Sequence, residues 1–521
     1  MSFTPDPPPP SAAPRTVSLL EILDDIEFRD YRGDLKIPVS ALALDSRLVR
    51  PGSAFFALKS ARPDAPGGAS HIADAINRGA VAIISEEILK ETCRPDPVWV
   101  RVADARRTLS AAALNFHAHP ERSLRLAAVT GTNGKTTVTT LLHHLLGTDN
   151  SKWGLVGTVR YELGGRSIPA HRTTPEAHEL AAMMAQMRDT GCEGLVMELS
   201  SHAIAQHRAD GLPFAALAFT NLTQDHMDYH GDMKSYFQTK ALPFLGKCGA
   251  APPPFAVLNA ADPAARNLAE ILPKTTRPLF FGEEDHADFR AVDIRLGPAG
   301  TTFKLLWPGA TAPVSVHTSL PGSYNVANIL CALALAHALG RPPEALIPAL
   351  ATFPGVPGRM ERVGDGWPCP IFVDYAHTDD ALRNALRMLR AITPGRLLVV
   401  FGCGGNRDRA KRPKMTAAVQ DLADFAWATS DNPRKEPQES IFEDMRTGVS
   451  APEKIAFIED RRHAISLALD GAREGDTLLI AGKGHEDYQE FSTVTIPFDD
   501  RLVTRELLSL KRLRPRQGII A

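Results

Sequence analysis

A short glycine-containing segment, Gly131 to Thr137, constrains the fold of this chain more than any other feature. An apolar run over 124–129 precedes it and predicts a β-strand, and residues 136–146 follow with leucines at helical spacing. In a strand–turn–helix unit, glycines let backbone N–H groups approach a phosphate, and the N-terminus of the helix favours an anion. The segment therefore predicts a phosphate-binding α/β unit.

The residue types within this segment indicate ATP. The lysine can reach the terminal phosphates, and a threonine hydroxyl after it can ligate Mg²⁺. The strict pattern has glycine where Val129 stands, so this is a shortened variant, and a purely structural turn is the simpler alternative. We expect ATP contacts from Gly131, Thr132, Asn133, Gly134, Lys135, Thr136 and Thr137, with Thr136 or Thr137 on the metal.

Strand-like and helix-like segments alternate along the rest of the chain, which indicates parallel sheets covered by helices. Strand-like runs occupy 79–84, 194–197, 216–219, 256–258, 371–373, 397–401, 425–428 and 478–481. Helical patterns include 70–76, 108–117 and 326–339. A single core stops growing well below 521 residues. We predict a small N-terminal α/β domain (16–112), a central ATPase-like domain with a mostly parallel sheet (113–352) and a Rossmann-like C-terminal domain (353–521).

Composition excludes several classes of protein. The formal net charge is −2, without the basic field that non-specific nucleic-acid binding needs. No run approaches the ~18 apolar residues of a membrane helix. Residues 1–15 lack the pattern of a signal peptide and are predicted to be a disordered tail. Six scattered cysteines form no metal or disulfide framework. We expect a cytoplasmic monomer that binds neither nucleic acid nor membrane.

The loop sequence Val129 to Thr137 resembles the ATP loop of the Mur ligases, which add amino acids to bacterial cell-wall precursors. More motifs of that family follow in order, from about Asp45 to Arg501. The resemblance implies an ATP- and Mg²⁺-dependent ligase. Its expected reaction joins meso-2,6-diaminopimelate to UDP-N-acetylmuramoyl-L-alanyl-D-glutamate through an acyl phosphate.

Residues that follow predicted strands match the family's metal and nucleotide contacts. The resemblance puts Mg²⁺ on Glu198 and His226 and makes Lys240 a carbamylated lysine that helps to hold a second ion. With Lys135, these are the expected catalytic residues. A carboxylate and an imidazole near phosphates suit Mg²⁺. By composition alone, Lys240 is a solvated helix lysine, and His230 is interpreted as structural. Further expected ATP contacts are Asn325, Arg359, Asp374 and His377.

Other motifs resemble the family's contacts to the UDP-linked dipeptide. Ser46 lies in a signature over 45–57, and His71 follows a stretch that departs from the family pattern. A turn and a strand are the simpler interpretation of this region. The remaining expected contacts are Thr173, Thr174, Ser200, Gln206 and Arg208.

The segment Asp431-Asn432-Pro433-Arg434 indicates the amino-acid substrate. A planar guanidinium binds a carboxylate through two hydrogen bonds. Diaminopimelate has one carboxylate more than lysine, so Arg434 favours the former. Glu486 suits an ammonium group. The resemblance completes the pocket as Arg407, Asp431, Asn432, Pro433, Arg434, Gly482 and Glu486.

Simpler interpretations and rival functions stay open at this stage. Asn325 can cap a helix, Arg208 can be surface charge, and Asp431 to Arg434 can be a turn. Another Mur ligase, a folylpolyglutamate synthase and an inactive nucleotide-binding regulator are the rival functions. The signature over 45–57 argues against the synthase, and intact Lys135 and Glu198 argue against the regulator.

Overall fold

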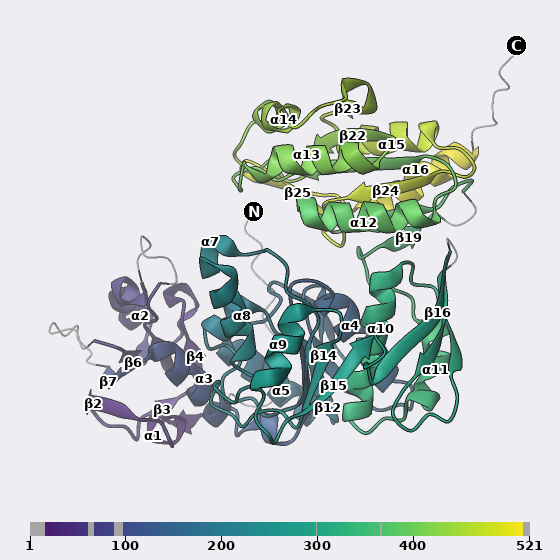
Figure 1. Ribbon diagram of the computed structural model, residues 1–521. Coiled ribbons are helices and arrows are strands. Elements are labelled where there is room, and N and C mark those ends of the chain that lie inside the picture. The colour runs from purple at the N-terminus through teal and green to yellow at the C-terminus, as the bar shows by residue number, and fades with distance from the viewer. Residues whose placement is uncertain (1–15, 61–66, 88–96, 298–299, 365–366, 514–521) are drawn as a thin grey trace, which may run out of the picture.

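The computed structural model describes residues 16–60, 67–87, 97–297, 300–364 and 367–513. The predicted disordered tail, residues 1–15, lies outside these ranges. Three α/β units follow one another along the chain, and the C-terminal unit lies above the other two in Figure 1. The predicted class of fold is confirmed by these sheets.

The N-terminal unit is built on a five-stranded sheet of order β2-β7-β6-β5-β4, in which only β2 runs antiparallel. Its elements are β1 (Val17–Ser18), α1 (Leu19–Ile22), β2 (Phe28–Arg32), β3 (Pro38–Val39), β4 (Ala41–Ala43), η1 (Ser46–Leu48), β5 (Ser53–Phe56), η2 (Gly68–His71), α2 (Ile72–Asn77), β6 (Ala80–Ser85), β7 (Val98–Val102) and α3 (Ala105–Phe116).

The central unit has an eleven-stranded sheet of order β11-β10-β9-β12-β8-β13-β14-β15-β16-β17-β18. Its strands are β8 (Arg125–Thr130), β9 (Trp153–Val156), β10 (Arg160–Glu162), β11 (Ser167–Pro169), β12 (Gly194–Glu198), β13 (Phe214–Phe219), β14 (Phe255–Asn259), β15 (Arg277–Gly282), β16 (Phe289–Gly297), β17 (Gly300–Leu306) and β18 (Val314–Thr318). Pairing is parallel from β9 to β16 and antiparallel at both ends.

Helices cover this sheet, and they pack against its strands to form two hydrophobic cores. They are η3 (Pro120–Arg122), α4 (Lys135–Leu146), α5 (Ala177–Asp189), α6 (Ser201–Ala205), α7 (Met227–His230), α8 (Met233–Ala241), α9 (Pro263–Ile271), α10 (Ser323–Ala338) and α11 (Pro343–Thr352). Helix α10 is apolar on nearly every side and is almost wholly buried, as expected of a helix inside a large domain.

The C-terminal unit has a six-stranded sheet of order β19-β20-β24-β21-β22-β23, antiparallel only at β19. A hairpin, β25–β26, follows β24. The elements are β19 (Glu361–Val363), β20 (Ile371–Asp374), α12 (Asp379–Ile392), β21 (Leu397–Cys403), α13 (Lys411–Leu422), β22 (Phe425–Ser430), α14 (Gln438–Arg446), η4 (Pro452–Lys454), β23 (Ile455–Phe457), α15 (Arg461–Gly471), β24 (Thr477–Ala481), β25 (Tyr488–Phe491), β26 (Val494–Pro497) and α16 (Asp500–Leu513).

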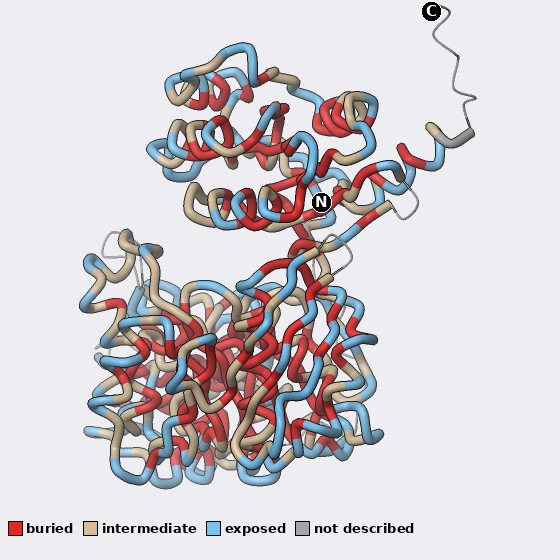
Figure 2. Tube along the Cα trace, turned by 45° about the vertical axis from the view of Figure 1, so that its right-hand side comes forward, coloured by how far each residue is buried: buried red, intermediate tan, exposed pale blue. Residues whose placement is uncertain are grey.

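Parallel strands buried on both faces explain why the apolar runs of the sequence coincide with strands. Figure 2 shows buried segments through the interior of each unit and exposed segments along the outer loops. The ends of the parallel strands therefore carry the loops that are free to hold a ligand. The domain boundaries near 112 and 352 stay a prediction, and α3 packs into the cores on both sides of the first.

Three predicted helix starts were wrong. Helix α10 begins at Ser323, so Asn325 lies inside its first turn rather than capping it. The Asn325 side chain donates to the Pro321 carbonyl (2.8 Å). Helix α2 begins at Ile72 after a 3₁₀ turn in which the Ser70 hydroxyl bonds back to Gly67. Helix α3 begins at Ala105, before the predicted start at 108, because the Asp104 side chain caps it.

Candidate active site

The phosphate loop connects β8 to α4 and is held in shape by the segment after β13. Gly131 and Gly134 have φ values of +143° and +87°. A Cβ atom on Gly131 would lie 2.0 Å from Oγ1 of Thr220, so only glycine fits there. The Thr220 hydroxyl donates to the carbonyl of Asn133 (2.6 Å), and the Asn133 N–H donates to Oδ1 of Asn221 (2.9 Å). The loop is therefore fixed by polar partners some 90 residues away.

Two lysine side chains end at the same loop carbonyl. Nζ of Lys135 and Nζ of Lys240 each lie 2.9 Å from the oxygen of Gly131. Lys240 is 1% exposed, so its interpretation as a solvated helix lysine was wrong. Burial, and then the charge of Lys135, lowers the pKa of Lys240 well below its ordinary value. A lysine with a lowered pKa has more neutral amine, the form that adds CO₂ to give a carbamate.

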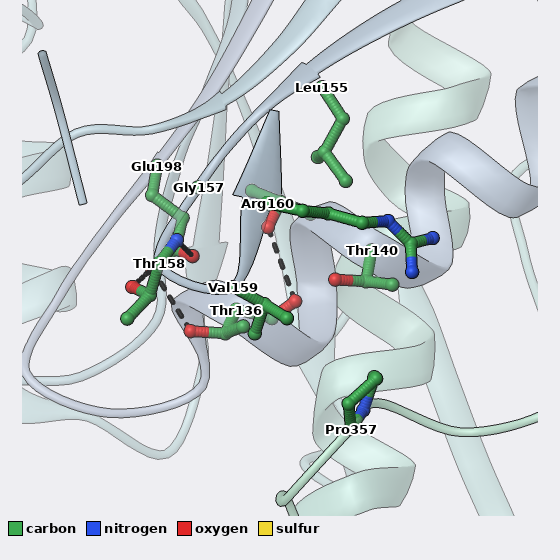
Figure 3. A pocket seen from close by; sticks show the side chains of 10 residues that line it. Thr136, Thr140, Leu155, Gly157, Thr158, Val159, Arg160, Glu198 and Pro357 are labelled. Carbon is green, nitrogen blue, oxygen red and sulfur yellow. Dashed lines mark hydrogen bonds between the residues drawn. The ribbon is translucent and has the colours of Figure 1, made fainter. Parts of the chain in front are cut away.

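Strand β12 ends at Glu198, whose buried carboxylate has three hydrogen bonds. It accepts from the backbone N–H of Thr158 (2.7 Å), from the Thr158 hydroxyl (3.1 Å) and from the Thr136 hydroxyl (3.1 Å). Figure 3 shows these three side chains directed toward one another at the edge of a small cavity. Thr136 is buried and Thr137 only partly so. Sequence reasoning missed Thr158, because its partner lies 40 residues away.

The donor atoms around Glu198 fit Mg²⁺. Carboxylate and hydroxyl oxygens are hard ligands, and Mg²⁺ takes few of them from protein while keeping waters and phosphate oxygens. Among the described residues, no group of three or more His, Cys, Asp and Glu side chains forms a metal site of its own. Thr136 and Glu198 therefore supply a partial ligand set, of the kind that a metal–nucleotide complex would complete.

His226 precedes α7 with a left-handed backbone (φ +55°). Its ring nitrogen lies 3.5 Å from the Asp225 carboxylate, and its ring centre lies 4.8 Å from that of His202. His230 bonds to the Ser201 hydroxyl (2.9 Å), which fits the structural role predicted for it. The structure thus places His226 on the segment between β13 and α8, the helix that carries Lys240.

The side chains predicted to bind the muramoyl dipeptide lie together beside the end of β12. The Thr174 hydroxyl accepts from the N–H of Ser200 (3.1 Å). Arg208 donates to the Thr174 carbonyl (3.0 Å) and to Oε1 of Gln206 (2.7 Å). Thr173 Oγ1 lies 3.1 Å from Oγ1 of Thr158, which links the group to Glu198. Arg208 is largely buried, so surface charge was the wrong interpretation.

In the N-terminal unit, Ser46 and His71 both lower the pKa of the Asp74 carboxyl. The pKa of the Asp74 carboxyl is lowered first by the Ser46 hydroxyl, then by Arg78, whose Nε donates to Oδ1 (3.0 Å), and last by the charge of His71. Ser46 is buried at the start of η1, while His71 is exposed at the start of α2. The two predicted UDP contacts are therefore close, and Asp74 is an addition that the sequence motif did not single out.

The start of the C-terminal unit brings Arg359 and Asp374 together. The Arg359 guanidinium lies 4.6 Å from the centre of the Tyr375 ring. Asp374 accepts backbone bonds from Met360 (2.7 Å) and Ala376 (2.9 Å). Burial raises the pKa of Asp374, and the charge of Arg359 opposes that rise.

The charge of Arg359 acts on Lys135 of the phosphate loop, and Asp374 adjoins the predicted amino-acid pocket. Burial is the main cause that lowers the pKa of Lys135, and the charge of Arg359 adds to it. His377 is exposed, with Nδ1 2.7 Å from the Tyr375 carbonyl. The N–H of Gly482 donates to the carbonyl of Asp374 (3.1 Å), so the two sets of predicted contacts are continuous.

The predicted amino-acid pocket forms where β21, β22 and β24 end. Nη1 of Arg434 donates to the Gly405 carbonyl (2.9 Å), and a Cβ on the neighbouring Gly404 would lie near both Arg434 and Arg407. Arg407 is exposed. A Cβ on Gly482 would lie 2.7 Å from Oδ2 of Asp431. The structure therefore brings the predicted residues of three separate loops to one place.

A lysine that sequence reasoning passed over lies beneath this pocket. Lys483 is fully buried, with Nζ 3.1 Å from Oε2 of Glu486 and 3.2 Å from Oδ1 of Asn432. Nδ2 of Asn432 also donates to Glu486 (2.9 Å). Glu486 was predicted to meet a substrate ammonium, and it already has a cationic partner here. The residue types of Gly482 to Glu486 do not indicate this role, because the Asn432 partner of Lys483 comes from another loop.

The fold and this site together define an ATP-dependent ligase built on a phosphate loop. Residues 129–336 match the Mur ligase middle domain, and residues 358–484 match the Mur ligase glutamate ligase domain. The chain belongs to the Mur ligase family.

Individual relatives extend this similarity over nearly the whole chain. The UDP-N-acetylmuramoyl-L-alanyl-D-glutamate–2,6-diaminopimelate ligase of Solibacter usitatus is 43% identical, over 94% of this chain and 98% of its own length. A solved structure of a ligase of the same name is 32% identical, with a TM-score of 0.68 over 96% of this chain and all of that one. A Mycobacterium tuberculosis folylpolyglutamate synthase complexed with ADP shares the fold at 19% identity, with a TM-score of 0.57 over 73% of this chain and 92% of that one.

Proposed function

We propose that this chain joins meso-2,6-diaminopimelate to UDP-N-acetylmuramoyl-L-alanyl-D-glutamate in an ATP-dependent reaction of cell-wall precursor synthesis. The observations that carry this proposal are two: a phosphate loop beside the buried Glu198 carboxylate in the central unit, and a group around Arg434 at the strand ends of the C-terminal unit. The relatives that bear this activity in their names match the chain almost end to end.

The first half-reaction activates the free carboxylate of the dipeptide. A carboxylate oxygen attacks the γ-phosphorus of ATP, the bond from that phosphorus to the bridging oxygen breaks, and ADP leaves with the electron pair. Lys135 offsets negative charge on the phosphates, and the loop amides orient them. Thr173, Thr174, Ser200, Gln206 and Arg208 form the polar wall that would hold the dipeptide beside Glu198.

Glu198 and Thr136 would hold Mg²⁺, with His226 as a further ligand and a carbamylated Lys240 for a second ion. When bound, Mg²⁺ neutralises phosphate charge during the transfer. The buried, low-pKa amine of Lys240 beside Gly131 supports the carbamate assignment. Asn325, Arg359, Asp374 and His377 are proposed to contact the nucleotide, and Ser46 and His71 the UDP group.

The second half-reaction forms the amide. A neutral amino group of diaminopimelate attacks the acyl carbon, the carbon–oxygen bond to phosphate breaks, and inorganic phosphate and a proton leave. Arg434 and Arg407 would bind the distal carboxylate, while Asp431 and Glu486 would bind the distal ammonium. The carboxylate that lysine lacks is thus the group that the pocket recognises.

We also propose a monomer that works in the cytoplasm, with domain boundaries near 112 and 352. The cysteines of the described residues are free thiols, which fits a reducing compartment. In the described part of the chain, every helix is too short or too polar to cross a membrane.

The test is ADP release from purified protein with ATP and the UDP-linked dipeptide, comparing meso-diaminopimelate, L-lysine and no amine. We expect release with diaminopimelate to exceed that with lysine by at least about 100-fold, because a site built for a polar group rejects an analogue that lacks it. Scrambling of oxygen isotope within ATP, without amine, would support the acyl phosphate. ADP release that ignores both the dipeptide and the amine would refute the proposal.

A further inference from the structure

The hairpin β25–β26 is docked through its first strand onto the segment Asp431 to Arg434. The buried amide of Gln489 donates to the Ser430 hydroxyl (3.1 Å) and to the Asp431 carbonyl (3.0 Å). The N–H of Glu490 donates to Oδ1 of Asn432 (3.1 Å). The hairpin is therefore a wall of the pocket, although it follows the matched glutamate ligase domain in sequence.

This wall fixes the backbone of Arg434. Arg434 has φ +55°, a left-handed conformation that is uncommon for a side chain of its size. Its N–H donates to the Glu490 carbonyl (2.9 Å), and its carbonyl accepts from the N–H of Ser492 (2.5 Å). Such a conformation persists where neighbouring structure holds it in place. Both backbone groups of Arg434 are held by the same short strand and its turn.

The Glu490 carboxylate also holds the Arg434 side chain. Oε2 of Glu490 lies 3.1 Å from Nε of Arg434, while Nη1 donates to the Gly405 carbonyl. A guanidinium has five donors in a rigid plane, so two such contacts fix the direction of its remaining donors. Nη1 also lies 3.5 Å from the Asn432 carbonyl, and none of these contacts uses Nη2. Nη2 of the guanidinium therefore keeps its donors for a carboxylate, while Nε and Nη1 are held by the protein.

We propose that Glu490 is a positioning residue for the amine substrate, acting through Arg434. Glu490 clamps Nε, and Arg434 thereby presents its Nη end to the distal carboxylate of the diamino acid. This inference rests on the proposed function, because it takes a dicarboxylic amine as the substrate. The opposite expectation is that Glu490 repels or displaces the substrate carboxylate, which predicts the reverse effect on KM.

The first experiment compares Glu490→Gln with the wild type in amine-dependent ADP release. We expect the KM for meso-diaminopimelate to rise about 10-fold, the size of effect that a hydrogen bond to a charged group gives. KM for ATP and kcat are expected to stay within about twofold. Glu439→Gln is the matched control, since it removes a carboxylate from an exposed ion pair of the same unit. An unchanged or lower KM for the amine in Glu490→Gln would overturn the proposal.

A double-mutant cycle separates positioning from any direct contact with substrate. In an Arg434→Ala background, Glu490→Gln should raise the KM for diaminopimelate by less than about twofold, because its partner is gone. A full 10-fold effect in that background would show that Glu490 acts without Arg434, and the proposal would fail.

A readout without substrate separates this inference from the proposed function. The Nε–H resonance of Arg434, assigned by its loss in Arg434→Lys, should exchange slowly with water in the wild type and rapidly in Glu490→Gln. If that difference is present and diaminopimelate still fails to release ADP, the clamp stands and the choice of amine is wrong. If exchange is equally fast in both proteins, the clamp itself is refuted.

Discussion

A fully buried ion pair, Arg461–Asp500, joins the two strand ends that carry the amino-acid pocket. Nε and Nη2 of Arg461 each lie 2.7 Å from an oxygen of Asp500, and both side chains have no exposed surface. Nη1 and Nη2 also donate to the carbonyls of Ser430 (3.2 Å) and Ala481 (2.9 Å), the last residues of β22 and β24. The loops that begin after these residues contain Arg434 and Glu486.

We predict that Arg461→Met lowers the free energy of unfolding of the C-terminal unit by about 3–5 kcal/mol. That is the range for removing one partner of a buried pair, because the other charge stays buried without compensation. Two strand-end carbonyls lose a donor as well, which places the expected value in the upper half of that range. For a unit of this size the melting temperature should fall by roughly 6–20 °C.

The assay is differential scanning calorimetry of Arg461→Met, Asp500→Leu and the double variant. The double variant should lose less than the sum of the single variants by about 2 kcal/mol or more, because it leaves no unpaired charge. Arg462–Glu506 offers a matched control, since it joins the same two helices at 2.8 Å but is exposed. Arg462→Met should cost less than about 1 kcal/mol. Additive single effects, or an Arg461→Met loss no larger than that of the control, would refute the reasoning.

Three further predictions concern the loop, the carboxylate and a second ion pair. Gly131→Ala should raise the KM for ATP by at least about 10-fold, because its Cβ would meet the Thr220 hydroxyl at 2.0 Å; steady-state kinetics measures this. Glu198→Gln should reduce ADP release about 10²–10³-fold with an unchanged melting temperature. Arg412 lowers the pKa of Glu436 to about 2, below its unfolded value, so this stabilisation is present above pH ~4.3 and is lost as pH falls toward 2. Glu436→Gln should therefore cost about 1–2 kcal/mol in urea melts at pH 7, after allowance for solvent screening, and much less at pH 3.

The parallel parts of the fold were predictable because their strands are buried on both faces. β8, β12, β13 and β14 appear in the sequence as unbroken apolar runs followed by loops. The antiparallel edge was not predicted. In β16 charged residues such as Arg290, Asp293 and Arg295 interrupt the apolar ones, so no unbroken apolar run marks the strand. Helix starts were wrong where a 3₁₀ turn or an aspartate cap preceded the apolar pattern.

The candidate site was predictable where its chemistry is local in sequence. The phosphate loop is continuous, so residue type and spacing identify it, whereas the continuous segment Asp431 to Arg434 was singled out by its resemblance to the family. Thr158, Lys483 and Glu490 were missed for a common reason. Each acts on a partner from another strand or loop, and a lone threonine, lysine or glutamate gives no signal by itself. Their placement depends on strand order, which the sequence does not state.

The residues proposed for the two half-reactions belong to two different units of the chain. The groups proposed for phosphoryl transfer, Lys135, Glu198 and Lys240, belong to the central unit, whereas Arg434 and Glu486 belong to the C-terminal unit. Between them lies the Arg359 turn, where a Cβ on Gly358 would lie 2.0 Å from the backbone nitrogen of His485. The backbones of the Arg359 turn and of the loop that carries Glu486 therefore pack directly against each other at Gly358, where only glycine fits. Together with burial, the charge of Arg359 helps to lower the pKa of Lys135, and the same turn packs against the loop that carries Glu486. The pocket proposed for the amine would thereby be positioned by the residues proposed to contact the nucleotide, which would hold the reacting groups in a fixed orientation.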